Sequence, residues 1–369
     1  MRRRTKILGS VLLVLIAGVS ALAIAVSHNS PCVAAPPLQT GAASMKAVVY
    51  RCYGPPEVAK LETVTKPVPG TNDILVKVRA ASVNPLDSHL LRGEPYLIRA
   101  LTGWGVPTDT QLQGDFAGTV EAVGTNVRRF KPGDRVFGGA GGAFADYVIT
   151  SADAWVEQMP PSLSFEQAAA IPTAGLTALQ ALRNYGQVQP GQRVLVNGAA
   201  GGVGTFAVQI AKALGAEVTA VTSTANLDLV RSIGADHVID YTREDFTRGT
   251  QLYDLIIDCG GGHSLLDFRR ALRPHGRYVR VGEAHSGRWI EPIANLFIIP
   301  PLMSRLVSQQ FIAFVSSASA ADLRTLGDLT HSGKMRPVLD RRYPLSEMPQ
   351  AIGYLETGHA RGKVIITLD

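Results

Sequence analysis

Hydrophobic and polar positions follow two different patterns along the chain, and the change of pattern divides it. Between residues 45 and 150, short apolar runs alternate with glycine-dense turns and show no helical period. This pattern predicts β-strands at 46–50, 74–80, 113–124 and 143–149. Between residues 193 and 281, short apolar runs alternate strictly with stretches of helical period, which predicts a parallel doubly wound sheet.

The connecting segments follow from the same periodicities. A helix is expected over 164–185, with a break near Pro172 that leads into the second region. We expect a loop over 81–87 and an edge strand over 309–315. The chain should end with a helix over 345–357 and a strand over 363–368.

A glycine-rich turn at residues 197–204 stands between a predicted strand and a predicted helix. Val194 to Val196 form the apolar run before it, and from Val203 the apolar positions take helical spacing. Such a turn lets backbone N–H groups and a helix N-terminus approach a pyrophosphate. The residues expected to bind the cofactor here are Gly198, Ala199, Gly201, Gly202, Val203 and Gly204, with Ala199 in the first glycine position of the dinucleotide fingerprint.

The residues after the second strand select between the two nicotinamide dinucleotides. An acidic residue at this point would bind the ribose 2′-hydroxyl of NAD. The sequence has Thr222, Ser223 and Thr224 instead, and a hydroxyl can donate to a 2′-phosphate that a carboxylate would repel. We therefore expect NADPH as the cofactor. Arg231 downstream fits equally a phosphate contact and a solvated helix charge.

An uncharged apolar run covers residues 7–27, behind the basic residues of the 1–6 segment. At 21 residues it is long enough to cross a bilayer as a helix, and longer than the apolar region of a secretory signal. We favour a membrane anchor over a cleaved signal, followed by a linker at 28–44. The basic flank would place the enzyme outside the cytoplasm, which conflicts with NADPH as a cytoplasmic metabolite, so the side of the membrane stays open.

Composition narrows the class of protein. A chain of 369 residues is long enough for two domains. The net charge is +6, but the basic residues are scattered and aromatic content is 7%, so no nucleic-acid module is indicated. The three cysteines, Cys32, Cys52 and Cys259, are too few and too far apart for a disulfide framework or a cysteine-based zinc site.

Five segments together resemble the medium-chain dehydrogenase/reductase superfamily, and most closely its zinc-independent quinone oxidoreductase branch. The segments are Asn84–Pro85, 114–124, 132–136, 193–216 and 362–366. The resemblance implies a GroES-like β-rich catalytic domain from residues 45–165 and 335–369. It implies a Rossmann NADPH-binding domain, with its doubly wound parallel sheet, at 166–334. With the transmembrane helix at 7–27, these make an α/β fold of two domains, for which we expect a homodimer.

The zinc ligands of zinc-dependent relatives are missing from the matching positions. Asn84 stands where those relatives have a cysteine ligand, and Gln113-Gly114-Asp115 stands where they have Gly-His-Glu. The cluster of four cysteines for a structural zinc is also missing, and His89 has no partner ligands nearby in the sequence. We therefore predict no metal.

Without a Lewis acid to polarise a carbonyl, a conjugated acceptor is the reasonable substrate. A quinone or activated enone spreads the charge that hydride addition creates, so we expect a small lipophilic molecule of this class. Two other readings stay open: an enoyl-thioester or other alkene reductase of the same superfamily, and a membrane-tethered nucleotide sensor without turnover. The apolar segment 290–307 fits a substrate site, a bilayer contact or a dimer interface.

The resemblance and the side-chain chemistry together assign the remaining site residues. Asn84 is the first candidate to donate a hydrogen bond to the substrate oxyanion, although it could also cap the turn before Pro85. Tyr96 is the second candidate, and Asp87 is expected to be structural. Further cofactor contacts are expected from Thr177, Cys259, Gly260, Gly282 and Lys363, with Ser223, Asn226 and Tyr241 at the adenine-phosphate end.

Overall fold

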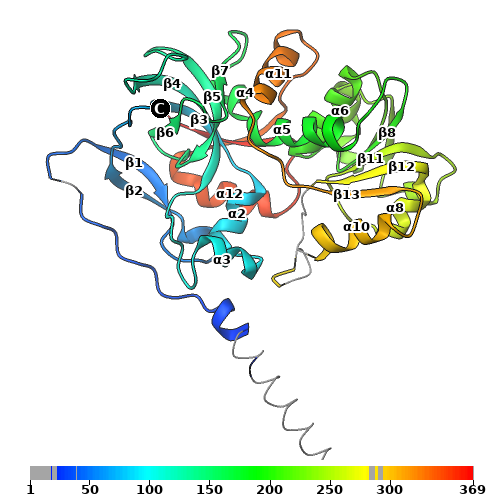
Figure 1. The fold of residues 1–369 in the computed structure, drawn as a ribbon, viewed down its shortest axis with the longest axis horizontal. Helices are drawn as coiled ribbons and strands as arrows, with labels where there is room; N and C mark the ends of the chain where they lie inside the picture. Colours follow the sequence, from blue (N-terminus) through cyan, green and yellow to red (C-terminus); the bar gives the residue numbers. More distant parts are fainter. Residues whose placement is uncertain (1–17, 19–22, 39, 282–286, 290–293, 369) are drawn as a thin grey trace, which may run out of the picture.

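The computed structural model describes residue 18 and residues 23–38, 40–281, 287–289 and 294–368. Its two large β-sheets lie on opposite sides of the molecule (Figure 1). Within the described part of the chain, one sheet has six strands and the other seven, and β1 (Ser44–Val49) pairs with β2 (Lys60–Thr65) beside them. The two sheets correspond to the two regions that the hydrophobic patterns distinguish.

The smaller of the two large sheets is parallel throughout, in the order β10-β9-β8-β11-β12-β13. Its strands are β8 (Arg193–Asn197), β9 (Glu217–Thr222), β10 (His237–Asp240), β11 (Tyr253–Asp258), β12 (Leu272–Arg280) and β13 (Gln310–Ala313). This order reverses between β8 and β11, as in the doubly wound dinucleotide-binding fold. The prediction of a parallel doubly wound sheet is confirmed, and the late strand lies at its edge.

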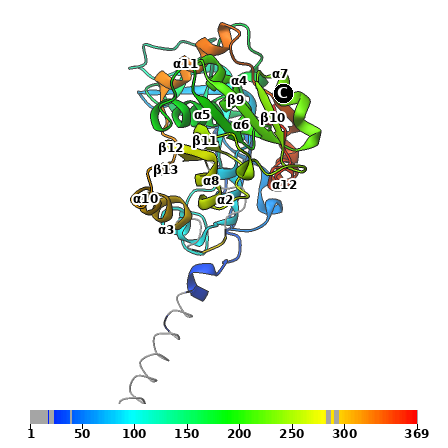
Figure 2. The same cartoon turned by 90° about the vertical axis from the view of Figure 1, so that its right-hand side faces the viewer.

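Helices cover both faces of the parallel sheet (Figures 1 and 2). They are α5 (Pro172–Gln180), α6 (Gly202–Ala213), α7 (Leu227–Ser232), α8 (Leu265–Ala271) and α10 (Ile299–Ser304), with α11 (Ala320–His331) packed on α5. The preceding helix α4 (Phe165–Ala169) contacts the other large sheet instead. The helix break falls between α4 and α5, where Pro172 starts the second helix. Val194, Val196, Phe206 and Ile210 are fully buried in the core that β8 and α6 share.

The mixed sheet combines both ends of the chain, in the order β14-β15-β3-β4-β5-β7, with β6 also on β3. Its strands are β3 (Asp73–Ser82), β4 (Gln113–Val123), β5 (Arg135–Gly141), β6 (Tyr147–Ser151), β7 (Val156–Gln158), β14 (Leu339–Pro344) and β15 (Lys363–Thr367). The helix α12 (Met348–Glu356) packs below it. The C-terminal strand β15 pairs antiparallel with β3, so the final residues complete this sheet.

The region expected to be free of helix contains two. They are α2 (Pro85–Arg92) and α3 (Arg99–Thr102), so the prediction of a loop through residue 87 is wrong. Pro85 occupies the first helical position and Asp87 accepts the backbone N–H of Asn84 at 2.7 Å, which starts α2 at that point. The local signal was present, since Asn-Pro-x-Asp combines an N-cap residue, an N1 proline and an N3 acid.

Short 3₁₀ or π turns connect these elements. They are η1 (Pro56–Val58), η2 (Tyr96–Ile98), η3 (Ala181–Tyr185), η4 (Thr224–Asn226), η5 (Phe246–Arg248), η6 (Ala294–Ile298) and η7 (Leu345–Glu347).

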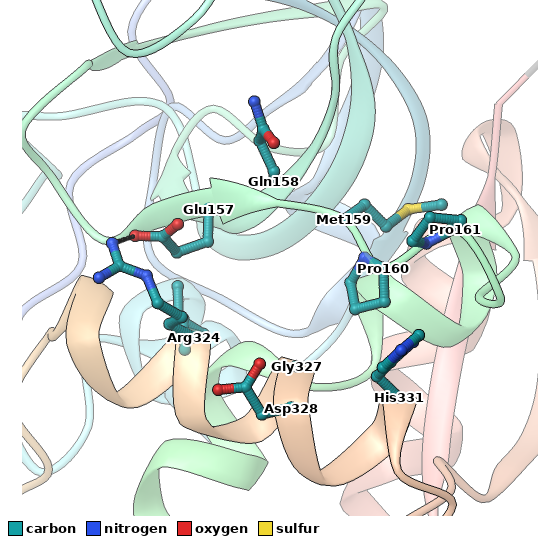
Figure 3. Close-up of a pocket in the computed structure, with 10 residues that line it drawn as sticks. Glu157, Gln158, Met159, Pro160, Pro161, Arg324, Gly327, Asp328 and His331 are labelled. Carbon is teal, nitrogen blue, oxygen red and sulfur yellow. Dashed lines mark hydrogen bonds and ion pairs between the residues drawn. The ribbon is translucent and has the colours of Figure 1, made fainter.

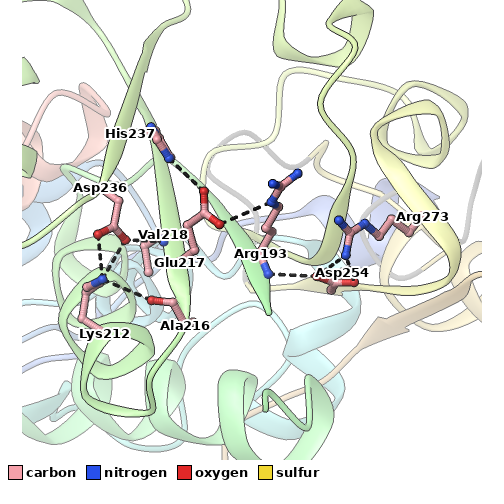
Figure 4. A network of polar contacts seen from close by, with 9 residues as sticks. All are labelled: Arg193, Lys212, Ala216, Glu217, Val218, Asp236, His237, Asp254 and Arg273. Carbon is pink, nitrogen blue, oxygen red and sulfur yellow. Dashed lines mark hydrogen bonds and ion pairs between the residues drawn. The ribbon is translucent and has the colours of Figure 1, made fainter. Parts of the chain in front are cut away.

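A network of ion pairs joins the amino-terminal ends of the parallel strands (Figure 4). Glu217 at the start of β9 accepts hydrogen bonds from Arg193 Nε at 3.3 Å and from His237 Nε2 at 2.9 Å. These contacts, led by the bond from His237, lower the pKa of Glu217. The network therefore lies at the edge of the sheet opposite the carboxyl ends, where open α/β sheets bind their ligands.

Residues 28–33, which we call the strap, attach the N-terminal segment to the globular part of the chain. Cys32 forms a disulfide with Cys52, a single bridge that was not anticipated from the sequence, which predicts no disulfide framework. The physical reason is tertiary: Ser30 N–H donates to Gly105 O at 3.0 Å and Val33 N–H to Arg51 O at 3.1 Å, which brings Cys32 back against the domain.

The predicted membrane span at 7–27 lies mostly outside the described residues. Residues 23–27 are helical and come directly before the strap. Among the helices that the structure describes, none combines the length and the apolar character needed to cross a membrane.

Candidate functional site

The glycine turn after β8 has the backbone geometry that its sequence predicts. Gly198 has a φ of +76°, and a Cβ on it would lie 2.9 Å from the backbone N of Gly260. A Cβ on Gly204 would lie 2.1 Å from Gly198 O, so α6 can approach β8 this closely only without a side chain there. The turn and the first turn of α6 are thus held together by backbone contacts.

The N-terminus of α6 opens into a space that has room for a methyl group at Gly201. Gly201 is its N-cap and supplies no side chain to cap the first N–H groups. A Cβ on Gly201 would find its nearest neighbour, Gly198 O, only at 3.4 Å. Gly202, Val203 and Gly204 form the first turn, so their N–H groups point away from the helix toward this opening. Uncapped N–H groups with room in front of them suit a pyrophosphate, which a helix N-terminus also attracts electrostatically.

The C-terminal residue of β8 holds the glycine turn against the end of β11. Asn197 at the end of β8 donates from Nδ2 to Asp258 Oδ1 and to Gly261 O, both at 2.8 Å. Gly260 lies against Gly198, at the predicted position beside the turn. Burial raises the pKa of the Cys259 thiol, so this cysteine stays protonated and acts as a buried apolar group.

The candidate residues for the adenosine end lie together after β9 and β10. Asn226 Nδ2 donates to Ser223 Oγ at 3.2 Å, and Asn226 Oδ1 is buried with no partner among the described residues. Tyr241 is 58% exposed, and its N–H donates to Thr222 O at 3.0 Å. An unpaired buried acceptor is unfavourable, and a bound ligand that donates to it would remove this cost. Ser223, Asn226 and Tyr241 therefore fit the adenosine end of a dinucleotide.

Two groups near this end were not anticipated. Asp240 accepts from Thr224 Oγ1, and this bond is the main cause of a lowered pKa for Asp240. Arg243 approaches Asp240 at 3.6 Å and is 77% exposed, which places a cation beside the hydroxyl cluster. Arg231 instead pairs with Asp228 at 3.1 Å on its own helix, as expected of a solvated helix charge.

A buried polar cluster joins the N-cap of α2 to the final strand. Lys363 Nζ donates to Asn84 Oδ1 at 2.5 Å and lies 3.6 Å from Asp115 Oδ2. Asn84 Nδ2 donates to Asp115 Oδ2 at 3.1 Å and to Ser82 O at 3.4 Å. Thr173 donates to Asp115 Oδ1 through its N–H at 3.1 Å and its hydroxyl at 2.6 Å. The cluster thus connects four separate parts of the chain, around residues 84, 115, 173 and 363.

This cluster lies next to the dinucleotide turn. A Cβ on Gly202 would lie 3.3 Å from Lys363 Cδ, and Gly362 N–H donates to Ala200 O at 2.9 Å. Burial is the main cause of a lowered pKa for Lys363 and of a raised pKa for Asp115, and each charge offsets the burial of the other. A buried ammonium therefore lies between the dinucleotide turn on one side and Asn84 and Asp115 on the other.

The Asn84 side chain is held in place by its protein neighbours in this structure. Both of its amide N–H donors are directed at protein acceptors, and its side chain does not cap α2. Asp87 does the capping with Oδ2, while its Oδ1 has no partner among the residues described. Donation from Asn84 to a substrate oxygen stays a prediction.

Tyr96, the first residue of η2, lies where the two domains meet. Its ring meets the Trp289 ring edge-on at 4.9 Å, and its N–H donates to Arg288 O at 2.9 Å. Arg99 stacks on the same ring at 4.8 Å. Tyr96 therefore stays a candidate donor at the domain boundary, and Trp289 beside it was not singled out from the sequence.

The remaining predicted contacts are placed as follows. Thr177 on α5 donates to Thr173 O at 2.7 Å and to Ser316 Oγ at 3.1 Å, which positions it beside the Asp115 cluster. Gly282 lies outside the described residues. Among the residues that are described, no group of three His, Cys, Asp or Glu side chains could hold a metal ion.

A hollow of about 250 Å³ between β7 and α11 is separate from this site (Figure 3). Met159, Pro160 and His331 line it, and the carboxylate of Glu157 is already paired with Arg129 at 2.6 Å and Arg324 at 2.8 Å. None of the cofactor or catalytic candidates lines it, so it does not bear on the chemistry.

Comparisons with known proteins agree with this geometry. Residues 70–161 match the family model described as alcohol dehydrogenase GroES-like domain, and residues 233–366 match zinc-binding dehydrogenase. The mouse mitochondrial NAD(P)H oxidoreductase RTN4IP1 is 34% identical, covering 88% of this chain and 89% of the relative. A chloroplast envelope quinone oxidoreductase homolog from Arabidopsis thaliana is 32% identical, covering 87% and 98%. The structure of a quinone oxidoreductase from Coxiella burnetii is 33% identical over 89% of this chain and 100% of its own, with a TM-score of 0.77.

Proposed function

The chain belongs to the medium-chain dehydrogenase/reductase superfamily, in its quinone oxidoreductase-like branch, and is an NAD(P)H-dependent oxidoreductase; we propose that it reduces a quinone or an activated enone with NADPH and without a metal. The observation that carries this proposal is the buried Lys363 ammonium, 2.5 Å from Asn84 Oδ1 and 3.6 Å from Asp115 Oδ2. It contacts Asn84, which stands where zinc-dependent relatives are expected to have a cysteine ligand.

An ammonium and an amide polarise the carbonyl of a simple ketone less strongly than a bound metal ion does. A conjugated acceptor needs less help, because the charge formed on hydride addition spreads from the reacting carbon to an oxygen. Bound NADPH supplies the hydride. The chain's own residues hold the dinucleotide through the α6 N-terminus and present polar hydrogens near the boundary between the domains.

Two residues are proposed to act on the acceptor's oxygen. Tyr96 lies at the domain boundary beside Trp289 and carries a phenolic O–H. Asn84 would donate only after one of its N–H groups leaves Asp115 or Ser82. We propose Tyr96 and Asn84 as the donors, with Lys363 and Asp115 positioning the Asn84 amide.

Turnover with matched acceptors tests the proposal. NADPH consumption should be rapid with benzoquinones, naphthoquinones and enones, and much slower with saturated ketones of the same size. Asn84→Ala should lower kcat/KM, whereas Asn126→Ala, at an exposed asparagine paired with Asn72, should not. Equal rates with saturated ketones, or no turnover with any conjugated acceptor, would contradict the proposal.

The preference for NADPH rests on the hydroxyl of Ser223 and the nearby cation Arg243. Ser223→Asp places a carboxylate where the 2′-phosphate is expected and should weaken NADPH binding by roughly tenfold or more, about 1.4 kcal/mol, while sparing NADH. Fluorescence titration of both cofactors measures this. Tighter binding of NADH than NADPH by the unmodified protein would overturn the preference.

We propose that the chain is anchored in a membrane through residues 7–27 and forms a homodimer. The anchor rests on the uncharged run behind a basic cluster. The Cys32–Cys52 disulfide supports a location outside the reducing cytoplasm. Protease protection of a C-terminally tagged chain would test the anchor. Thiol labelling of Cys32 and Cys52 would test on which side of the membrane the domain lies. Light scattering in detergent would test the dimer. A wholly soluble full-length chain would exclude the anchor.

A further inference from the structure

A set of exposed apolar side chains gathers at the end of the molecule from which the N-terminal segment departs. We call this set the apolar rim; its members are Leu101 (87% exposed), Trp104 (55%), Trp289 (44%), Ile298 (56%), Leu302 (54%) and Leu306 (75%). They come from α3, the loop after it, and the region of α10. In both views of the fold, α3 and α10 lie at the same end, next to residues 23–27 (Figures 1 and 2).

The two halves of the rim are joined. Tyr96 precedes α3 and contacts Trp289 through its ring at 4.9 Å and Arg288 through a backbone hydrogen bond of 2.9 Å. Arg288 also pairs with Glu94 at 3.3 Å. The rim thus crosses the boundary between the catalytic and nucleotide-binding domains, beside the candidate donor Tyr96.

The N-terminal segment is fixed to the same place by a buried arginine. Arg99 is 1% exposed and donates to Val26 O at 3.1 Å, His28 O at 3.0 Å and Asn29 Oδ1 at 2.8 Å. The bond from Ser30 to Gly105 and the Cys32–Cys52 disulfide continue the attachment. The last residues of the uncharged run 7–27 are therefore held beside α3 rather than on a free linker.

From these contacts we propose that the apolar rim lies against the surface of a lipid bilayer, so that the domain boundary near Tyr96 opens toward the membrane. Exposed apolar side chains in one region mark an interaction surface, and tryptophans are enriched where protein meets the headgroup region. The occupant is a bilayer because residues 26–29, which end an apolar run of membrane-spanning length in the sequence, are held beside the rim. Exposed Arg288 and Arg305 lie among these residues and suit anionic headgroups.

This inference rests on the proposed function for one further step: the acceptor is a quinone dissolved in the membrane, which reaches the site across the rim. A lipophilic quinone would then avoid passing through water. The location of the rim itself does not depend on turnover, so the two claims can fail separately.

The three tryptophans of the chain allow a direct test in the full-length protein. Trp155 packs against the core directly before β7, which lies at the end of the molecule away from α3 and α10 in Figure 1. Single-tryptophan variants, made by tryptophan-to-phenylalanine substitution at the other two positions, are reconstituted into vesicles that contain lipids with brominated acyl chains. Emission from Trp104 and Trp289 should be quenched more than that from Trp155. Equal quenching at all three positions overturns the bilayer contact.

A second measurement separates the bilayer from a second copy of the chain. Leu101→Ser/Leu302→Ser should raise the KM for a membrane-dissolved quinone and leave the KM for a water-soluble quinone unchanged. Val68→Ser, at an 85% exposed valine between β2 and β3, is the matched control. If the rim variant instead changes the oligomeric state and not the KM, the face is a dimer interface and the inference is wrong. Quenching without turnover of any quinone would remove the proposed function and keep the bilayer contact.

Discussion

Asp87 shows how a single buried carboxylate can set a pH dependence. Its Oδ2 accepts the N–H of Asn84, whereas Oδ1 has no partner among the described residues, and burial raises its pKa well above the ordinary value of 3.8. A folded-state pKa above the unfolded one means that its contribution to stability is fully present below pH 3.8. That contribution is lost as the pH rises through the folded pKa.

Asp87→Asn removes the charge, so its free energy of unfolding relative to the unmodified protein should increase as the pH rises from about 4 to about 8. Urea unfolding at several pH values measures the difference. The exposed Asp328→Asn serves as the control and should show no such trend. A difference that is constant with pH would show that Asp87 is not the titrating group.

Lys363 and Asp115 form a second residue-scale feature. Each compensates the buried charge of the other, and removing one partner leaves the remaining charge without compensation. Lys363→Met should therefore destabilise the fold by about 3–5 kcal/mol, and Asp115→Asn should cost less when it is made in that variant than when it is made alone. Lys212→Met, which breaks the half-exposed pair with Asp236 in Figure 4, should cost about 1 kcal/mol or less from that pair. Equal losses in denaturant unfolding would contradict this ranking.

At the scale of elements, the β8–α6 turn combines two glycines with different roles. Gly204 permits helix–strand contact, because a Cβ there would come within 2.1 Å of Gly198 O. Gly201 leaves space in front of the helix N-terminus, with its nearest neighbour at 3.4 Å and an ordinary φ of −77°. Gly204 is thus needed for packing of the helix on the strand, and Gly201 for room at the ligand site.

Alanine substitutions should separate these roles. Gly204→Ala should destabilise the protein by about 1–3 kcal/mol, because backbone must move to admit the methyl group. Gly201→Ala should change stability by less than about 1 kcal/mol but weaken NADPH binding, since the methyl group occupies space that the pyrophosphate needs. Thermal unfolding and cofactor titration provide the two readouts. If Gly201→Ala bound NADPH normally, the pyrophosphate would not lie over this turn.

At the scale of the whole molecule, the two domains meet around a buried ammonium. Lys363 from the C-terminal strand lies among Asn84, Asp115 and the dinucleotide turn, and its positive charge disfavours a divalent cation at that place. Turnover should therefore survive exhaustive chelation, and elemental analysis should find no stoichiometric zinc. One zinc per chain, with activity lost on its removal and restored on its return, would refute metal independence.

The sequence alone determined the nucleotide-binding half in most of its detail. Val194–Val196, the glycines at 198, 201 and 204, and the helical period from Val203 are local signals that act within a few residues. Backbone conformation and burial are both determined at that range. Glycine favours the positive φ of Gly198 and permits the close contact at Gly204, and the apolar spacing determines which faces are buried.

Only the tertiary structure decided what surrounds that turn. Asn84 and Lys363 are 279 positions apart, and their contact exists because β15 pairs with β3. The attachment of residues 28–33 was likewise missed, since neither Arg99 nor Cys52 carries any local sign that the chain before residue 34 folds back to them. Hydrogen bonds, ion pairs and disulfides between distant residues depend on how the elements pack, and hydrophobic periodicity records only which face of each element is buried.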